Sequence, residues 1–210
     1  MKPLSSKAVS LAPAPAPLVV VLSGPSGAGK DAVLSAMKAR SMPMSYIVTN
    51  TTRPQRPGEV DNVHYHFVSQ QEFKRLIDGH DLLEHAEVYG HFYGVPKAPV
   101  RQAMEQGQDV IIKVDVQGAM TIKKNLNGAV LIFLMPPSME ELAQRLKGRN
   151  TESRGDLEIR LDTARSEIEK LPHFDYVVMS YQDRIEKAVD DITAIITSEK
   201  LRVTRREYKV

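Results

Sequence analysis

The chain has 210 residues, of which 42% are hydrophobic and 26% charged, a composition typical of a globular protein large enough for one substantial core. Its 28 basic and 26 acidic residues give a net charge of +2, so it lacks the strong positive excess of nucleic-acid-binding proteins. Without cysteine it can form neither a disulfide nor a thiolate metal site, and no apolar run approaches the ~20 residues that cross a bilayer.

The first 17 residues contain two lysines, no acidic residue and an alternating Ala-Pro stretch. Such a stretch favours extended polyproline conformations and offers nothing to bury, which predicts a flexible tail. The same composition also fits the remnant of an organellar targeting segment. We therefore expect a cytoplasmic protein, with a plastid or a mitochondrion as the alternative if the tail is such a remnant.

Residues 17–23 form a β-branched run that predicts a strand buried on both faces, and apolar residues at helical spacing predict a helix over 31–40. The segment between them is Gly24-Pro25-Ser26-Gly27-Ala28-Gly29-Lys30. A strand, a glycine loop and a helix in this order match the phosphate-loop pattern, whose glycines let successive N–H groups point into one concavity. Lys30 can then reach the β- and γ-phosphates of a nucleotide; a plain tight turn is the alternative.

Asp31 stands where the phosphate-loop pattern has a Ser or Thr that ligates Mg²⁺. A carboxylate can also hold Mg²⁺, directly or through water, but its charge close to the phosphates would by itself oppose nucleotide binding. We therefore expect a compensating change elsewhere in the site.

A short strand is predicted over 46–49, followed by a loop rich in Pro, Arg and Gly over 51–60. Arg53 and Arg56 lie on this loop, and two guanidinium groups held by prolines suit bidentate binding of a phosphate monoester. Taken alone, these residues also fit a solvated basic loop.

The pattern changes between 65 and 93. A short strand over 65–68, a helix over 69–79 with Ser69 as N-cap, and an acidic-aromatic stretch follow one another there. We interpret this part as a small insertion that lies outside the main sheet.

Buried strands resume at 110–115 and 129–135, each followed by a helix, and the second helix begins with the Ser138 and Glu141 spacing of a capping box. Alternating strands and helices predict a parallel sheet with right-handed crossovers. The predicted fold class is therefore α/β, with a central parallel sheet flanked by helices.

An apolar-poor segment over 149–158 precedes a helix to about 171, a strand over 176–180 and an amphipathic helix over 184–201. The basic residues around this segment are Arg145, Arg149, Arg154, Arg160 and Arg165. Charge that develops between a phosphoryl donor and its acceptor needs positive groups that arrive once both substrates are bound, which a mobile lid provides. We expect a helical lid over about 150–170, although Arg145, Arg154 and Arg165 fit a solvated helix face equally well.

Together these stretches resemble the guanylate kinase family over nearly the whole chain, from about 18 to 202. TTRPQRPGEV is similar to that family's loop for the GMP phosphate, LLEHAEVYGHFYG to its guanine-reading segment, and VIIKVDVQGA to its Walker-B-like strand. The resemblance implies a set of GMP-binding residues that consists of Thr49, Arg53, Arg56, Tyr65, Glu84 and Tyr93.

Within this set, the resemblance implies that the two arginines and two tyrosines hold the GMP phosphate, while Thr49 contacts the base and Glu84 reads guanine. Guanine presents N1–H and N2–H donors on one edge, which a carboxylate can accept and adenine does not offer. Specificity for guanine would therefore follow from Glu84.

The resemblance further implies that Lys30, Arg149 and Arg160 are catalytic and that residues 24–31 bind the ATP phosphates. Mg²⁺ is the implied cofactor, held at Asp31 and at Asp115, whose place at the end of a strand beside the phosphate loop suits a metal bound through water. The implied reaction transfers the γ-phosphoryl group of ATP to GMP, and also to dGMP, through positioning and charge stabilisation without a side-chain nucleophile.

The implied organisation is a P-loop kinase fold in one domain over 18–205, with tails at 1–17 and 206–210. Its core comprises 18–49, 94–149 and 171–205, with a GMP-binding insertion at 50–93 and the lid described above.

The chain departs from the family pattern at Lys113, where an acid is expected two residues before Asp115. Strand alternation places both side chains on the same face. We hypothesise that Lys113 compensates for Asp31 and forms an ion pair with it; the alternative is that Lys113 extends into solvent at the strand end. Ser180 also departs, because the family often has an asparagine there beside the adenine, so no adenine contact is assigned to it.

Two other functions remain open on the sequence: a non-catalytic guanylate-kinase-like module that binds protein ligands, and a monophosphate kinase for another base. Such modules typically lose the phosphate-loop lysine or the lid arginines, whereas this chain keeps both. The expected partners are ATP and GMP, with no nucleic acid and no membrane, since the basic residues cluster at the lid and acceptor loop. The sequence leaves the oligomeric state open.

Overall fold

The structure is a computed structural model that describes residues 16–88, 90–147, 154–204, 206 and 208. Its strands are β1 (Val19–Ser23), β2 (Met44–Ile47), β3 (Asn50–Thr51), β4 (His66–Phe67), β5 (Leu82–Val88), β6 (His91–Pro96), β7 (Asp109–Lys113), β8 (Val130–Met135) and β9 (Tyr176–Met179). Its helices are α1 (Lys30–Ala39), α2 (Gln70–Asp78), α3 (Lys97–Glu105), α4 (Val116–Asn125), α5 (Met139–Lys147), α6 (Arg154–Ile168), the 3₁₀ helix η1 (Leu171–His173) and α7 (Ile185–Lys200).

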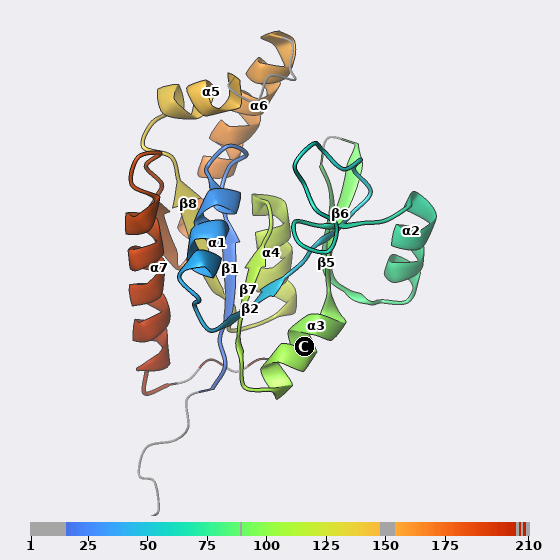
Figure 1. Cartoon of the computed structure of the whole chain (residues 1–210), viewed down its shortest axis with the longest axis vertical. Helices are drawn as coiled ribbons and strands as arrows, with labels where there is room; N and C mark the ends of the chain where they lie inside the picture. The colour runs from blue at the N-terminus through green and yellow to red at the C-terminus, as the bar shows by residue number, and fades with distance from the viewer. Residues whose placement is uncertain (1–15, 89, 148–153, 205, 207, 209–210) are drawn as a thin grey trace, which may run out of the picture.

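The main sheet has five parallel strands in the order β2-β7-β1-β8-β9. β1 is the central strand, with β7 on one side and β8 on the other (Figure 1). Helices connect successive strands and cover both faces, as parallel sheets require. The predicted α/β fold class is confirmed.

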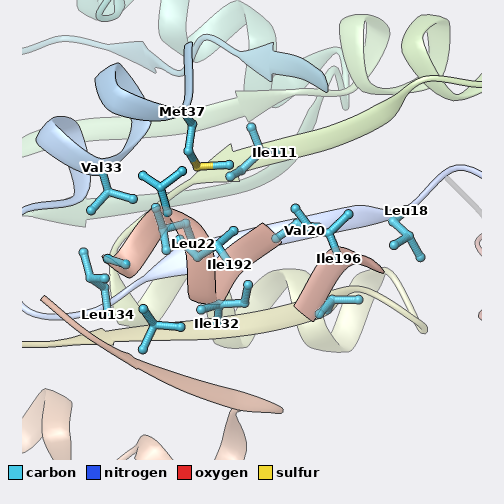
Figure 2. Packing of buried hydrophobic residues seen from close by; sticks show 14 of the residues in the cluster. Leu18, Val20, Leu22, Val33, Met37, Ile111, Ile132, Leu134, Ile192 and Ile196 are labelled. Atoms are coloured by element: carbon cyan, nitrogen blue, oxygen red, sulfur yellow. The ribbon is translucent and has the colours of Figure 1, made fainter. Parts of the chain in front are cut away.

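The residues of β1 point alternately to two separate cores. Val20 and Leu22 pack in the core that β1 shares with α1 and α7, where Met37 and Ile192 are also buried (Figure 2). The intervening valines face α3 and α4 on the other side of the sheet. Because both faces are buried, β1 has a continuous apolar sequence, and its packing fixes the position of the loop that follows it.

The second sheet has four strands in the order β4-β3-β6-β5, with an antiparallel hairpin of β5 and β6. α2 packs on it through the buried Phe73, whose ring stacks on Phe92 with centroids 5.5 Å apart. The Glu72 N–H donates to Ser69 Oγ at 3.1 Å, which confirms the predicted N-cap. β5 also contacts α4, so the small sheet lies beside the main one (Figure 1).

Two strands end two residues earlier than the sequence predicted. The strand expected over 46–49 ends at Ile47, because the chain leaves the main sheet there and Asn50 already pairs in the second sheet. The strand expected over 110–115 ends at Lys113, because Asp115 is the N-cap of α4, a position that Asp favours. The polar residues that follow both strands therefore lie where the chain leaves the sheet.

α5 and α6 pack against each other through Leu142, Leu146 and Ala164, beyond the carboxyl ends of the main strands (Figure 1). α5 begins as predicted, with the Glu141 N–H donating to Ser138 Oγ at 3.1 Å. The chain between these helices lies outside the described residues, which start again at α6. Within the described part, no helix has the length and apolar character needed to span a membrane.

The C-terminal segment returns to the main sheet. Arg206 donates two hydrogen bonds of 2.8 Å to the fully buried side chain of Glu199 on α7. The Val19 N–H donates to the Tyr208 hydroxyl at 3.3 Å. Both residues fall in the predicted tail over 206–210, yet their side chains contact the domain; the predicted domain bounds otherwise stay a prediction.

Candidate active site

A cleft of about 730 Å³ opens where the carboxyl end of the main sheet meets the second sheet. Its lining comes from the loop after β1, the loop after β3, the β5–β6 hairpin, the start of α4 and one face of α6. This is the place where open parallel sheets bind ligands, and the volume suits a small-molecule site. The cleft brings Lys30, at the start of α1 beside the main sheet, together with Arg53 and Arg56, which lie on the loop after β3 of the second sheet.

The loop after β1 has the backbone that a phosphate loop needs. Gly24, Gly27 and Gly29 have φ of 139°, 89° and 96°, a region that residues with a Cβ adopt only with strain. A Cβ at Gly24 would also lie 2.3 Å from the carbonyl oxygen of Leu134. The loop therefore curls tightly between β1 and the N-terminus of α1, the end of a helix that attracts anions.

Of the predicted loop residues, Ser26, Gly27, Gly29 and Lys30 line the cleft directly. Gly24, Pro25 and Ala28 do not line it and instead shape the turn, with the Ala28 N–H donating to the Pro25 carbonyl at 3.0 Å.

The ammonium of Lys30 lies inside the curl of the loop. Its Nζ donates to the carbonyls of Gly24 at 2.5 Å and Pro25 at 3.1 Å. Burial lowers the pKa of Lys30, against the raising effect of Glu167, Asp31 and Asp115. A buried ammonium whose partners are two neutral carbonyls can exchange them for the charged oxygens of an anion such as a nucleotide phosphate.

The arginine loop is organised by Glu59. Arg53 Nη2 donates to both Glu59 carboxylate oxygens, at 2.7 and 3.0 Å, and the Arg56 N–H donates to Glu59 Oε2 at 2.8 Å. Burial would raise the pKa of Glu59, but the hydrogen bonds from Arg53 hold it below its usual value. Only 8% of the Arg53 side chain is exposed, so the predicted alternative of a solvated basic loop does not describe this residue.

Tyr65 and Tyr93 line the cleft beside these arginines. Their rings meet edge to face with centroids 6.0 Å apart, and Arg53 Cζ lies 5.5 Å from the Tyr65 centroid. Two hydroxyls and two guanidinium groups therefore converge on one wall, an arrangement able to bind a phosphate monoester.

Glu84 lies in β5 at the floor of the cleft and is 4% exposed. Its Oε2 has no hydrogen-bond partner among the described residues. Burial first, and the charge of Asp115 second, raise the pKa of Glu84 to about 8, against a backbone hydrogen bond with Val95. A buried polar atom without a partner is costly unless a ligand supplies one, so this carboxyl suits a ligand with N–H donors.

Gly118, which the sequence reasoning missed, makes room for that carboxyl. A Cβ at Gly118 would lie 2.8 Å from Glu84 Oε2 and 3.1 Å from Asp115 Oδ1. The Gly118 N–H also donates to Asp115 Oδ1 at 2.7 Å and caps α4. Thr49, 4% exposed, lines the same end of the cleft and donates through Oγ1 to the Lys113 carbonyl at 3.3 Å.

The predicted ion pair between Asp31 and Lys113 is confirmed. Lys113 Nζ lies 2.6 Å from Asp31 Oδ1 and 4.2 Å from the Tyr65 ring centroid. The Lys113 side chain is 11% exposed and that of Asp31 is 63% exposed. The lysine therefore points into the cleft, and the alternative in which it extends into solvent is wrong.

The two predicted metal-binding residues, Asp31 and Asp115, both line the cleft near Lys30. Among the described residues no group of three or more His, Cys, Asp or Glu side chains forms a cage for a metal. Mg²⁺ ordinarily binds one or two carboxylates together with substrate phosphates and waters, so this donor set fits Mg²⁺ that arrives with a nucleotide.

One face of α6 closes the cleft. Arg160, Thr163 and Glu167 all line it, at spacings of three and four residues that place them on one side of the helix, and Lys170, two residues after the helix end, lines it as well. Arg165 points elsewhere, 62% exposed and paired with Asp162. Of the other predicted lid arginines, Arg149 and the side chain of Arg154 lie outside the described residues.

Glu167 is a further cleft residue that the sequence reasoning missed. Burial raises the pKa of Glu167 to about 7, opposed by the charge of Lys30 and by a backbone hydrogen bond with Ser26. Its Oε2 has no hydrogen-bond partner among the described residues. The helical spacing from Arg160 is the signal that could have identified it.

Arg145 does not line the cleft and instead supports the phosphate loop from behind. Its guanidinium donates to the Ala28 carbonyl at 3.3 Å and the Ser180 carbonyl at 2.6 Å, and it pairs with Glu141. Ser180 is 3% exposed and its hydroxyl lies close behind Gly29. It too does not line the cleft.

Comparisons of the sequence and of the structure with known proteins identify the same family. The sequence model of a family described as guanylate kinase matches residues 17–199. The chain is 43% identical over 201 residues to guanylate kinase 2, chloroplastic/mitochondrial, of Oryza sativa subsp. japonica, covering 95% of this chain and 70% of the relative. It is 44% identical over 191 residues to the guanylate kinase of Desulfitobacterium hafniense, covering 91% and 94%. The crystal structure of guanylate kinase from Anaplasma phagocytophilum superposes with a TM-score of 0.72 at 32% identity, covering 91% of this chain and 90% of that one.

Proposed function

The chain belongs to the guanylate kinase family, and from this premise we propose which of its residues hold ATP and GMP and carry the transfer between them. As a guanylate kinase it is an enzyme that moves the γ-phosphoryl group of ATP to GMP and forms ADP and GDP. We extend the proposal to dGMP as an acceptor.

The donor site is the loop after β1. Residues 24–31 surround the ATP phosphates with backbone N–H groups, and the positive end of α1 adds to their attraction. Lys30 exchanges its two carbonyl partners for the β- and γ-phosphate oxygens, for which its buried charge is well placed. This cation then stabilises charge that develops on the transferred group.

Asp31 and Asp115 are the residues that would hold Mg²⁺. A Mg²⁺ ion bound there with ATP would supply positive charge that offsets the charge of the phosphates. Asp115 is fixed by the Gly118 N–H, and Asp31 is shared with Lys113, so both carboxylates are held in place before the nucleotide arrives.

The acceptor site is the opposite wall of the cleft. Arg53, Arg56, Tyr65 and Tyr93 hold the GMP phosphate and aim one of its oxygens at the γ-phosphorus. At the floor, Glu84 accepts the N1–H and N2–H of guanine, with Thr49 beside it. Adenine lacks this pair of donors, so AMP leaves the buried carboxyl unsatisfied.

α6 supplies Arg160 to the space between donor and acceptor, together with Arg149 from the segment before it. These groups stabilise the equatorial oxygens of the transferred phosphoryl. The observation that carries the proposal is that Lys30, at the start of α1 after the central strand β1, lines a single cleft with Arg53 and Arg56, on the loop after β3 of the second sheet.

The test is the rate of ADP formation with ATP, Mg²⁺ and one of GMP, dGMP, AMP, CMP or UMP. We expect kcat/KM for GMP to exceed that for AMP or UMP by at least ~10²-fold, because a site built around buried hydrogen-bond partners rejects analogues that lack them. A preference for AMP or UMP, or nucleotide binding without turnover, would favour the alternatives of another monophosphate kinase or a non-catalytic module.

Two α6 variants provide a matched comparison. Arg160→Gln is expected to lower kcat, since Arg160 lines the cleft, while Arg165→Gln, on the exposed side of the same helix, is expected to leave it unchanged. Equal effects of the two would argue against a specific role for Arg160.

A cytoplasmic location stays a prediction for this chain. The name of the rice relative assigns that protein to chloroplasts and mitochondria, whereas the Desulfitobacterium relative is bacterial. Fractionation of the source cells with an antibody against this chain would decide between the cytoplasm and an organelle.

A further inference from the structure

Lys113 lies at the boundary between the two substrate sites. It is the last residue of β7, and its side chain extends into the cleft between the donor loop and the acceptor wall. Asp31, at the start of α1, holds its ammonium from the donor side at 2.6 Å. The ring of Tyr65, on the acceptor side, lies 4.2 Å from the same nitrogen.

Stabilisation of the fold does not explain why the Lys113 ammonium lies in the cleft. Within the described part of the chain, Asp31 is the carboxylate that pairs with it at 2.6 Å, and Asp31 is 63% exposed, so the pair gains modest Coulomb energy. Lys30, Arg53, Arg56 and Arg160 line the same cleft and repel Lys113, although carboxylates such as Glu59, Asp115 and Glu167 offset part of this repulsion. When a phosphate occupies the space that these cations share, its attraction for each of them outweighs their mutual repulsion.

We propose that Lys113 is a catalytic residue that contacts the GMP phosphate beside Tyr65, and that Asp31 is the positioning residue that holds its ammonium there. This inference rests on the proposed function, since it takes Tyr65 as part of the acceptor phosphate site. An ammonium has three donors, so Lys113 can keep its bond to Asp31 while it donates to a phosphate oxygen.

The ion pair also explains why Asp31, an acid at the start of α1, need not weaken the binding of the ATP phosphates. Asp31 is charge-balanced by Lys113, and the pair places its cation toward the acceptor and its anion toward the donor loop. The ion pair therefore orders a lysine that would otherwise lose side-chain entropy on binding.

The test compares equilibrium binding of GMP and of guanosine, which lacks the phosphate. In Lys113→Met the Kd for GMP, measured by titration calorimetry without ATP, is expected to rise roughly tenfold to hundredfold, as for loss of a charge-assisted hydrogen bond. The Kd for guanosine, measured by competition in the same titration, is expected to stay unchanged. Lys113→Arg, which keeps the charge, is expected to retain most of the GMP affinity.

Asp31→Asn tests the positioning role. In the wild-type background it is expected to raise the Kd for GMP, and in Lys113→Met it is expected to have no further effect, because the residue it positions is gone. Independent effects of the two substitutions would show that Asp31 does not act through Lys113.

The control is Lys38→Met. Lys38 also stacks its ammonium on a tyrosine, 5.1 Å from the Tyr46 centroid, but it lies outside the cleft, so GMP binding is expected to be unaffected. Thermal unfolding of each variant reports whether it is folded, and if Lys113→Met is not, Lys113→Gln takes its place.

Unchanged GMP affinity in folded Lys113→Met, or an equal loss for GMP and guanosine, would overturn the inference. Such a result with a wild-type enzyme that phosphorylates GMP would leave the proposed function intact. A wild-type protein that fails to phosphorylate GMP would instead reject the proposed function itself.

Discussion

Binding of GMP at pH 7 is expected to release close to one proton per site from Glu84. The carboxyl is buried and has a pKa of about 8 in the structure, so it is mostly protonated at neutral pH. In the proposed complex guanine N1–H and N2–H donate to it, which would favour the ionised form once GMP is bound. The perturbation that isolates this carboxyl is Glu84→Gln, which keeps its size and removes its titration.

The size of the expected change in GMP affinity follows from the pKa of Glu84. At pH 7, one unit below about 8, roughly nine tenths of the sites carry the proton, and removing it costs about 1.4 kcal/mol, or about tenfold in GMP affinity. The affinity of the wild type is therefore expected to rise about tenfold per pH unit up to pH 7 and to level off above pH 8. The phosphate of GMP ionises near pH 6, so the range from 7 to 8.5 isolates the carboxyl.

The assay is titration calorimetry at pH 7 in two buffers with different ionisation enthalpies, since the difference between the observed heats gives the protons released. Glu84→Gln is expected to release none, to show no rise in affinity between pH 7 and 8.5, and to bind GMP roughly 10- to 100-fold more weakly than the wild type at pH 8.5. Its amide has one acceptor and one donor group, so one guanine donor faces a donor. Glu105→Gln, on the exposed surface of α3, is the control and should match the wild type.

No proton release by the wild type at pH 7, or the same release by Glu84→Gln, would refute this reasoning.

The pH dependence of stability gives an independent check that the pKa of Glu84 is raised rather than lowered. Because the folded pKa of Glu84 is raised, its contribution to stability is fully present below pH 4.5 and is lost as pH rises to about 8. Denaturant unfolding should therefore show Glu84→Gln more stable than the wild type at pH 9, by up to a few kcal/mol, and similar to it near pH 4.5.

Three further substitutions have definite expected outcomes. Gly118→Ala puts a methyl group against the Glu84 carboxyl and should raise KM for GMP more than KM for ATP in steady-state kinetics; equal changes would count against the close contact. Glu167→Gln removes a negative charge beside Lys30, so calorimetry at pH 8 should show ATP bound severalfold more tightly, and weaker binding would contradict this. Arg206→Ala leaves the fully buried carboxylate of α7 without its guanidinium and should cost about 3 kcal/mol in denaturant unfolding, whereas a change below ~1 kcal/mol would show that the segment contributes little.

The sequence was sufficient to predict the phosphate loop and the sheet that carries it. The signals are local in the sequence. A strand buried on both faces requires a run of apolar residues, and the tight phosphate-binding turn after it requires glycines and, at its end, Lys30. The ion pair of Asp31 and Lys113 was also predictable, since two departures of opposite charge at facing positions indicate a contact.

Other parts of the cleft depend on packing that a single sequence does not encode locally. The burial of Glu84 results from β5 lying against α4, where Gly118 leaves room for the carboxyl. In the sequence Glu167 looks like any exposed glutamate of a helix, and only the orientation of α6 brings it close to Lys30. Strand ends were also missed by two residues at Ile47 and Lys113, because the following residues pair or cap elsewhere.

The most direct test of a shared cleft is binding of adenosine and guanosine joined 5′ to 5′ by five phosphates. If Lys30 and the Arg53/Arg56 loop hold donor and acceptor face to face, this compound should bind one per chain and compete with both ATP and GMP. Competition with only one nucleotide, or two molecules bound per chain, would contradict a single cleft for the transfer.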